Sequence, residues 1–290
     1  MERELWKILS QQITRLDHDW GLGRYTHSVG RIVRVYMWAV LHDRPVCWAC
    51  EPGNWMGVKP PRRLPDQSCM SRRMNHDPRT QQMLDQLADA LGEDDQATLV
   101  RYLDAKPLTV SRHSQDAQAT FGRGAGGKDR GYKLHAIYAG KNKPMAWSLT
   151  PLNRNEHHVA VPLMTDHLTP GYLLADANYD ANHLYEHAGQ HHVQLLTPRR
   201  YRHAQGLGHH RHSAHRREAI GRLDAPSPFA RQLLAQRRRI ETRFAHLTNF
   251  GGGLTCLPPW VRGLHRVRLW VAGKILIRLA RDQRKRQTAA

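Results

Sequence analysis

Three acidic residues are candidates for catalysis: Asp104, Asp176 and Glu241. Predicted strands and a predicted helix would hold their side chains in place. Asp104 ends the β-rich run 98–104 (TLVRYLD), and Asp176 ends the short apolar run 172–176 (YLLAD). Two strands that end side by side place both aspartates at one edge of a sheet. Glu241 lies on a later amphipathic helix, which can supply a third carboxylate if it packs across that edge.

These acids predict a site for hard divalent cations. Three neighbouring carboxylates repel one another strongly without a cation, so we expect Mg²⁺ or Mn²⁺ to bind them, with water and phosphate oxygens completing the coordination. Two such ions about 4 Å apart activate an attacking oxygen and stabilise the leaving oxygen during phosphodiester cleavage. The expected cofactor is therefore a pair of Mg²⁺ or Mn²⁺ ions.

Each aspartate also has a simpler interpretation. Asp104 could act only as a turn former at the end of its strand. Asp176 has a neighbour of the same type, Asp180, four residues further along the chain. We expect Asp180 to cap the helix that starts near Asn182, which leaves Asp176 as the catalytic candidate.

The surroundings of Glu241 allow two interpretations. Its neighbours on the helix include four arginines: Arg237, Arg238, Arg239 and Arg243. A glutamate among arginines commonly forms only an i, i+4 ion pair on a solvated face. The apolar residues Ile240 and Phe244, in contrast, place Glu241 at the edge of an apolar stripe, from which it would face inward.

The elements that would position these acids form an α/β fold. Hydrophobic periodicity predicts the order β-β-β-α-β-α-β-α, which favours one mixed sheet flanked by helices. The expected strands are 98–104, 132–138, 145–149, 172–176 and 193–197, and the expected helices are 157–167, 182–189 and 228–247. The segment 264–284 is predicted to be a further amphipathic helix.

The part of the chain before this sheet is predicted to be helical, because its apolar residues recur at spacings of three and four. Asp66 and Ser68 can cap a helix that carries Arg72 and Arg73. That helix could enter a DNA groove, or its arginines could form an ordinary solvated face. We therefore expect a helical N-terminal DNA-binding or accessory region at 1–95 and a catalytic domain at 96–290.

The charge balance indicates a polyanionic partner. The 290 residues contain 44 Lys plus Arg and 25 Asp plus Glu, so the formal net charge is +19. Each Lys or Arg placed against a phosphate releases a counterion and adds affinity that does not depend on base sequence. The most apolar runs, 29–41 and 269–280, are short and contain charged residues, so we predict neither membrane insertion nor a secretory signal, and we expect a cytoplasmic protein.

Two basic segments are expected to contact DNA phosphates. Arg112 and Lys133 flank the Gly-rich segment 122–127, which lacks the phosphate-loop pattern and which we interpret as a mobile loop over the site. The second segment is a basic insertion around 199–227, rich in Arg and His, which begins with Arg199 and Arg200. We interpret it as an exposed loop between the second aspartate and the glutamate.

The chain resembles the DDE transposases of bacterial insertion sequences, in particular the group named for insertion sequence four. The resembling segments are YLDAKPLTV (102–110), GYKLHAIY (131–138), LLADANYDANHLYE (173–186), RRRIETRFAHL (237–247) and the Arg-bearing helix LPDQSCMSRRM (64–74). Together they span about residues 60–280. The resemblance implies a ribonuclease-H-like fold in which Asp104, Asp176 and Glu241 are the catalytic acids and ligate two divalent ions.

One signature of this group is kept only in part. It consists of Tyr, Arg, Glu and Lys with two, three and six residues between them. Arg237 stands at the Arg position relative to Glu241, but Leu234 replaces the Tyr and Thr248 replaces the Lys. A neighbouring subgroup, with Arg three residues before Glu, would match Arg238 instead.

The resemblance implies a nucleoid-associated transposase that cuts one strand at the end of an insertion sequence, after which the freed 3′-hydroxyl attacks a second phosphodiester. The expected partners are double-stranded DNA, at the terminal inverted repeats and at the target, and a second copy of the chain, because two ends must be brought together. Expected DNA contacts are Arg72, Arg73, Arg112, Lys133, Arg199, Arg200, Arg237 and Arg238. Two alternatives stay open: a DNA-binding protein on an inactivated scaffold, and a metal-dependent nuclease without strand transfer.

Overall fold

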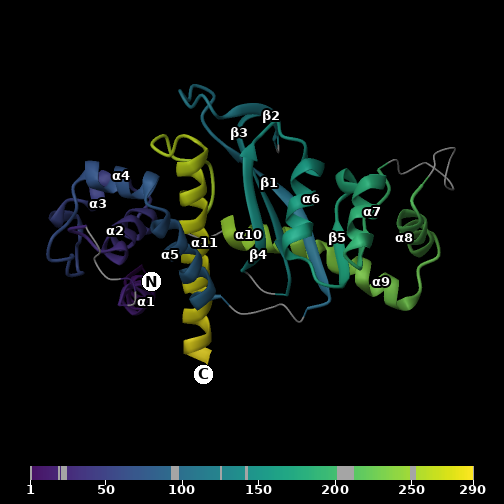
Figure 1. Cartoon of the computed structure of the whole chain (residues 1–290), viewed down its shortest axis with the longest axis horizontal. Coiled ribbons are helices and arrows are strands. Elements are labelled where there is room, and N and C mark those ends of the chain that lie inside the picture. The colour runs from purple at the N-terminus through teal and green to yellow at the C-terminus, as the bar shows by residue number, and fades with distance from the viewer. Residues whose placement is uncertain are drawn as a thin grey trace. The chain divides into compact units, whose positions relative to one another are not determined.

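Two compact units make up the chain. The first comprises residues 1–93, 110–118 and 246–290, and the second comprises residues 94–109 and 119–245. The structure, a computed structural model, describes residues 2–18, 20, 25–92, 98–124, 126–140, 143–200, 212–248 and 253–289. Figure 1 shows the helices of the first unit and the sheet of the second.

The first unit is built from helices, as its apolar spacing predicts. They are α1 (Glu2–Asp17), α2 (Val29–Leu41), α3 (Val46–Ala49), α4 (Gln67–His76), α5 (Pro78–Leu91) and α11 (Leu264–Ala289), with the 3₁₀ turn η1 (Pro52–Asn54). The start of α4 follows local sequence rules, because the Asp66 carboxylate accepts the backbone N–H of Cys69 at 2.6 Å. Asp77 caps α5 by accepting the N–H of Arg79 at 3.2 Å, and Pro78 occupies the first helical position.

Aromatic packing holds the α1, α2 and α3 region together. The Trp38 ring stacks on Trp55 at 4.8 Å and meets Trp6 edge-on, also at 4.8 Å. Both indole N–H groups of the stacked pair have backbone acceptors, at 3.1 Å for Trp38 and 2.9 Å for Trp55. This cluster therefore buries large apolar rings without leaving their N–H donors unpaired.

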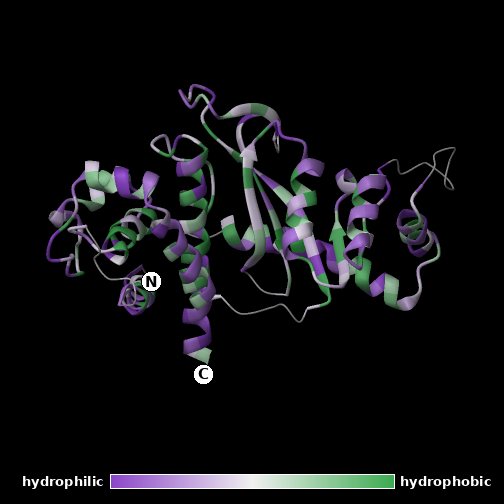
Figure 2. Cartoon of the chain, viewed as in Figure 1, coloured by the Kyte–Doolittle hydropathy of each residue, from purple (hydrophilic) through white to green (hydrophobic). Residues whose placement is uncertain are grey.

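The C-terminal helix α11 belongs to this helical unit. Residues 269–280 of α11 are all buried, including Lys274. The Lys274 ammonium donates to the carbonyl of Val40 at 3.1 Å and to Asp43 at 2.5 Å, so a positive charge inside the helical core is neutralised. The last turns of α11 are hydrophilic, as Figure 2 shows. No helix in the described part of the chain is both long and apolar enough to span a membrane.

The second unit contains the predicted mixed sheet. Its strands are β1 (Val100–Thr109), β2 (Thr120–Gly124), β3 (Gly127–Tyr138), β4 (Pro144–Pro151), β5 (Gly171–Ala175) and β6 (Val193–Leu196). The order is β2-β3-β1-β5-β6, and β4 pairs with β3. Strand β1 is antiparallel to β3 but parallel to β5, which is parallel to β6. This mixed arrangement is ribonuclease-H-like.

The Gly-rich segment differs from its prediction. Residues 122–127 were expected to form a loop, but 120–124 form strand β2, which pairs antiparallel with 127–131 of β3. A Cβ at Gly122 would lie 2.7 Å from the carbonyl oxygen of Leu152, so glycine is needed for this close approach. Glycines carry no side chains that could show a two-residue period, and the strand was therefore not visible in the sequence.

Helices flank the sheet. They are α6 (Glu156–His167), α7 (Asn182–Gln190), α8 (Ala214–Asp224), α9 (Pro228–Ala235) and α10 (Arg239–Thr248), with 3₁₀ turns η2 (Ala177–Tyr179) and η3 (Gln236–Arg238). The long helix predicted over 228–247 is thus interrupted by η3. Part of the basic insertion, 201–211, lies outside the described residues, as do Lys141 and Asn142 of the turn between β3 and β4.

Side chains of the helical segment that follows β6 bind the sheet beside Asp104. Gln236 of η3 accepts a hydrogen bond from the Tyr102 hydroxyl at 3.1 Å. Tyr102 lies on β1, two residues before Asp104. Phe244 of α10 is buried and meets the Tyr138 ring at 5.8 Å in an edge-on contact. These contacts fix η3 and the start of α10 against the face of the sheet that carries Asp104.

Candidate active site

Asp104 and Asp176 lie side by side on neighbouring parallel strands. The register of β1 and β5 pairs Leu103 with Ala175. Asp104 is the next residue of β1, which continues to Thr109, so the prediction that the strand ends at Asp104 is wrong, and Asp176 directly follows the last residue of β5. Neighbouring strands are about 4.8 Å apart, and residues in register point to the same face. The structure therefore brings together two of the three acids that the sequence analysis selected.

The Asp104 carboxyl is in an unfavourable environment for its negative charge. The pKa of Asp104 is raised to about 7, mainly by burial, and the nearby charges of Asp176 and Glu156 contribute to this increase. The N–H of Ala105, which donates to Asp104 at 2.7 Å, and the charge of Arg237 act in the opposite direction. A divalent cation would relieve this repulsion.

Asp176 follows strand β5 and caps the 3₁₀ turn η2. Its carboxylate accepts the backbone N–H of Asn178 at 2.9 Å and the side-chain amide of Asn178 at 3.1 Å. Burial still raises the pKa of Asp176, and the charge of Glu156 contributes to the increase. The side chain is thus held in place at the sheet edge while its charged form remains disfavoured.

Asp180 has a structural role that differs from the predicted cap. Its carboxylate binds the Arg216 guanidinium at 3.1 and 3.0 Å and accepts the backbone N–H of Arg200 at 3.0 Å. Ala181 is the residue at the cap position of α7, so the prediction that Asp180 caps this helix is wrong. Because these donors already bind Asp180, Asp176 is the better candidate for a cation ligand.

Glu241 lies on the exposed surface of α10. It forms no ion pair with any described residue, so the arginines around it do not neutralise it in the arrangement described. Position 241 is one helical turn after Arg237, whose positive charge lowers the pKa of both Asp104 and Asp176. The charge of Arg237 thus reaches the two aspartates, whereas the assignment of Glu241 to the site stays a prediction.

Glu156, a fourth acid, was not selected in the sequence analysis. It is the first residue of α6, and its Oε1 lies 2.8 Å from the ammonium of Lys133. A glutamate in the first turn of a helix after an Asn cap is common, because the helix dipole favours it there. That signal is present at Asn155 and Glu156, but it does not distinguish a site residue from an ordinary helix start.

The carboxylate oxygens of Asp104 and Asp176 are of the donor type that suits a hard cation. No group of three His, Cys, Asp or Glu side chains in the described ranges is close enough to hold a metal ion. The two strand aspartates nevertheless provide adjacent carboxylates, the donor type that Mg²⁺ and Mn²⁺ prefer. Buried Arg237 Nε and Tyr179 Oη have no hydrogen-bond partner among the residues that the structure describes, which fits a site made for a further charged or polar group.

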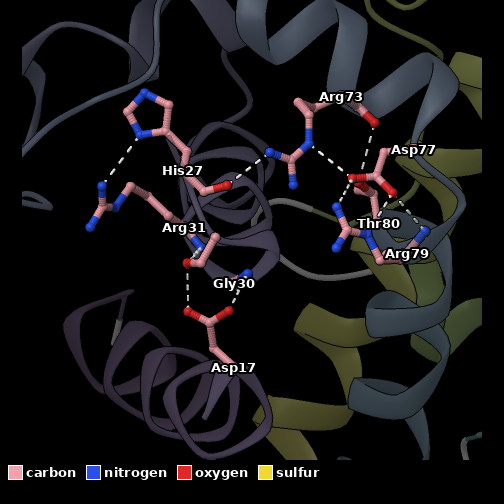
Figure 3. Close-up of polar contacts among 9 residues, drawn as sticks. Asp17, His27, Gly30, Arg31, Arg73, Asp77, Arg79 and Thr80 are labelled. Atoms are coloured by element: carbon pink, nitrogen blue, oxygen red, sulfur yellow. Dashed lines mark hydrogen bonds and ion pairs between the residues drawn. The ribbon is translucent and has the colours of Figure 1, made fainter. Parts of the chain in front are cut away.

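The predicted DNA-contacting arginines on α4 face different environments. Arg72 is exposed, whereas only 5% of Arg73 is exposed. Arg73 binds Asp77 at 2.9 Å and the carbonyl of His27 at 2.8 Å, and its guanidinium stacks on the Tyr25 ring at 3.9 Å. Figure 3 shows the contacts of Arg73 with Asp77 and His27. Of these two arginines, only Arg72 presents its side chain to solvent.

Apart from Arg237, which is described above, the other predicted DNA contacts also fall into two groups. Arg112, Arg200 and Arg238 are exposed. Lys133 and Arg199 are engaged in ion pairs, with Glu156 and Asp224 respectively. Exposed arginines can reach phosphate directly, whereas the paired side chains would first have to exchange partners.

The fold and the two strand aspartates together define a protein of the ribonuclease-H-like class with an acidic site at the edge of a mixed sheet. The profile of the family described as transposase DDE domain matches residues 95–279. The chain therefore belongs to the family of transposase DDE domains, whose members are DNA-processing enzymes that generally use divalent metal ions. No curated protein and no solved structure matches it. Its place in the insertion-sequence-four group stays a prediction.

Proposed function

We propose that the protein is a transposase that cleaves DNA at the ends of an insertion sequence and joins those ends to a target. The observation that carries this proposal is the adjacent placement of Asp104 and Asp176 on β1 and β5, within the segment that the family profile covers. Asp104, Asp176 and Glu241 are the proposed ligands of two Mg²⁺ or Mn²⁺ ions. When bound, such ions lower the pKa of the attacking oxygen and stabilise the leaving one.

The chain's own residues have separate roles in this proposal. Asp104 and Asp176 are held by the sheet and by η2, so they would hold the divalent ions with little rearrangement. Arg237 carries a positive charge that already acts on both aspartates, and we propose that it contacts the phosphate that is cut. The exposed arginines Arg112, Arg200 and Arg238 bind the DNA backbone.

Synapsis of two terminal inverted repeats requires at least two copies of the chain, so the proposed active form is a DNA-bound homodimer on the chromosome. The formal charge of +19 supports association with DNA in the nucleoid.

The direct test is cleavage of DNA that carries the terminal inverted repeats, with Mg²⁺ or Mn²⁺ and with a chelator. We expect strand cleavage at the repeat ends followed by joining to target DNA only when the divalent ion is present. DNA of the same length without the repeats is the matched control. Binding without cleavage at any divalent ion would favour the inactivated scaffold, and cleavage without joining would favour a nuclease.

Arg72 supplies a test of DNA contact in the helical unit. Arg72→Ala is expected to weaken DNA affinity equally for different sequences and to lower the salt slope of binding by about one. Stability should stay unchanged, because the side chain is exposed. Fluorescence anisotropy with labelled DNA at several salt concentrations measures both quantities. An unchanged salt slope would remove Arg72 from the interface.

A further inference from the structure

One face of the hairpin formed by β2 and the start of β3 carries an aromatic ring among basic side chains. The register pairs Phe121 with Arg130 and Arg123 with Lys128. Residues paired directly across two antiparallel strands point to the same face, so these four side chains share one face, which we call the aromatic-basic face. Asp129 lies between Lys128 and Arg130 and therefore points to the opposite face. Among the described residues of this hairpin, the aromatic-basic face carries three cations and no acid.

The aromatic ring on this face is open to solvent and lies beside two cations. The exposed fraction of Phe121 is 52%, although most large apolar side chains of the sheet are buried. The Lys128 ammonium lies 5.5 Å from the centre of the Phe121 ring, and the Arg130 guanidinium lies 5.8 Å from it. Both distances are within the range of cation–π contacts. Arg123 and Lys128 are also exposed, so the ring and its charged neighbours are accessible to the same ligand.

Contacts at the base of the hairpin hold the aromatic-basic face in place. The Thr120 hydroxyl donates to Oδ1 of Asn153 at 3.0 Å and accepts the backbone N–H of Asn153 at 3.1 Å. Arg130 donates through Nε to the carbonyl of Ala119 at 3.0 Å, so the backbone orients its guanidinium. A surface that is ordered before binding loses little conformational entropy when a ligand docks.

The aromatic-basic face lies on the same side of the sheet as Asp104. In the register of β1 and β3, Asp104 is opposite Ala136, and Arg130 precedes Ala136 by six residues on β3. Side chains an even number of residues apart on one strand point to the same face, and six residues span about 20 Å. That length corresponds to about six nucleotides at about 3.4 Å each. DNA with its cut phosphate at Asp104 therefore has nucleotides within reach of the hairpin.

We propose that the aromatic-basic face binds an unpaired DNA strand near the cut, with the Phe121 ring stacked on one base and the three cations on phosphates. Charge complementarity supports DNA as the partner, because the described residues of this face offer cations alone to a polyanion. The exposed ring supports an unpaired strand, because a base offers its planar surface only where the duplex is open. This inference rests on the proposed function, since it concerns the DNA that the site would cut.

Binding of the full chain to labelled single-stranded DNA, with a chelator present to prevent cleavage, tests the role of the ring. Phe121→Ala is expected to lower the affinity by about tenfold or more, and Phe121→Leu, which keeps apolar area without a ring, should do the same. Phe121→Trp should keep or raise the affinity. The matched control is Phe229→Ala on α9, which should leave the affinity unchanged, because the exposed fraction of Phe229 is also 52%.

The salt dependence of single-strand binding separates stacking from charge. Arg123→Gln and Lys128→Gln are each expected to lower the salt slope by about 0.7, because one phosphate contact is lost. Phe121→Ala should lower the affinity without changing this slope. A fluorescent purine analogue in the strand should change its emission on binding to the unaltered chain but not on binding to Phe121→Ala, since only the former stacks on the base.

The outcomes separate this inference from the proposed function. Full single-strand affinity in Phe121→Ala or Phe121→Leu would overturn the stacking. An equal loss of affinity for single strands and for closed duplex would also overturn it, because the ring would then act as a wedge between base pairs. If the unaltered chain binds no single strand yet cleaves and joins DNA with terminal repeats, the inference fails and the proposed function stands. If it binds single strands through Phe121 but cleaves no DNA with any divalent ion, the binding surface stands and the proposed function fails.

Discussion

Replacing Asp104 by asparagine is expected to raise the stability of the metal-free protein near neutral pH and to abolish DNA cleavage. The stability effect follows from the raised pKa of Asp104, which is about 7 in the folded protein against an ordinary value of 3.8. At a pH between these two pKa values, Asp104 holds a proton in the folded chain and releases it in the unfolded chain. The free energy of unfolding therefore falls as pH rises through this window, by up to about 4 kcal/mol.

Asparagine keeps the shape of the side chain without its charge. The variant should match the unaltered protein near pH 4 and exceed it at about pH 8, measured as the urea midpoint of unfolding in the presence of a chelator. Asp166→Asn, an exposed aspartate on α6, is the control and should shift neither midpoint. If the variant were less stable than the unaltered protein at about pH 8, the conclusion that the folded protein disfavours the charged form of Asp104 would be wrong.

The same substitution removes a proposed cation ligand. Cleavage of DNA with terminal repeats should fall by about a thousandfold or more, as expected when one member of a catalytic set is removed. Mg²⁺ should stabilise the unaltered protein but not the variant, because only the former binds the ion tightly. A stable, well-folded Asp104→Asn protein that still cleaves DNA would show that the strand aspartates are not the site.

Replacing Arg73 by alanine is expected to destabilise the protein by about 3 kcal/mol, because it leaves a buried carboxylate with one partner fewer. Arg73 and Asp77 are almost fully buried, with 6% and 5% of their side chains exposed. Arg79 continues to bind Asp77 through two hydrogen bonds of 3.0 Å, which limits the loss. The carbonyl of His27 also loses its donor (Figure 3).

Urea midpoints of Arg73→Ala and Arg72→Ala provide the comparison. Arg72 is the adjacent, exposed arginine, and its replacement should change the free energy of unfolding by less than about 0.5 kcal/mol. Arg73→Lys should recover only part of the stability, because an ammonium cannot reproduce the planar contacts with Asp77, His27 and Tyr25. If Arg73→Ala kept full stability and lost DNA affinity, Arg73 would be a DNA contact after all.

Several features of the site could be predicted because they depend on local pattern. Asp104 and Asp176 follow apolar runs that were recognisable as strands, and the alternation of strands and helices favoured a mixed sheet in which the two runs are neighbours. That β1 continues past Asp104 to Thr109 was not predicted. The cap of α4 at Asp66 also follows from residue type and spacing. The hairpin of β2 with β3 was missed, because glycines hide the strand period.

Other features depend on contacts that no local pattern encodes. Arg72 and Arg73 are adjacent and identical in type, yet one is exposed and the other is buried against Asp77. Asp180 has the right type and position for a helix cap, but the Arg216 guanidinium, 36 residues further along the chain, binds it instead. In both cases a long-range partner decides the role of the side chain.

The alternation of strands and helices from β3 to β6, the strong positive charge and the choice of Asp104 and Asp176 were determined by the amino-acid sequence alone, because periodicity and residue type act over a few neighbouring positions. Only the tertiary structure decided that Glu156 and Tyr179 lie near those aspartates and that α11 belongs to the helical unit. A periodic pattern shows that a face is buried. Which distant element covers that face depends on the packing of the whole chain.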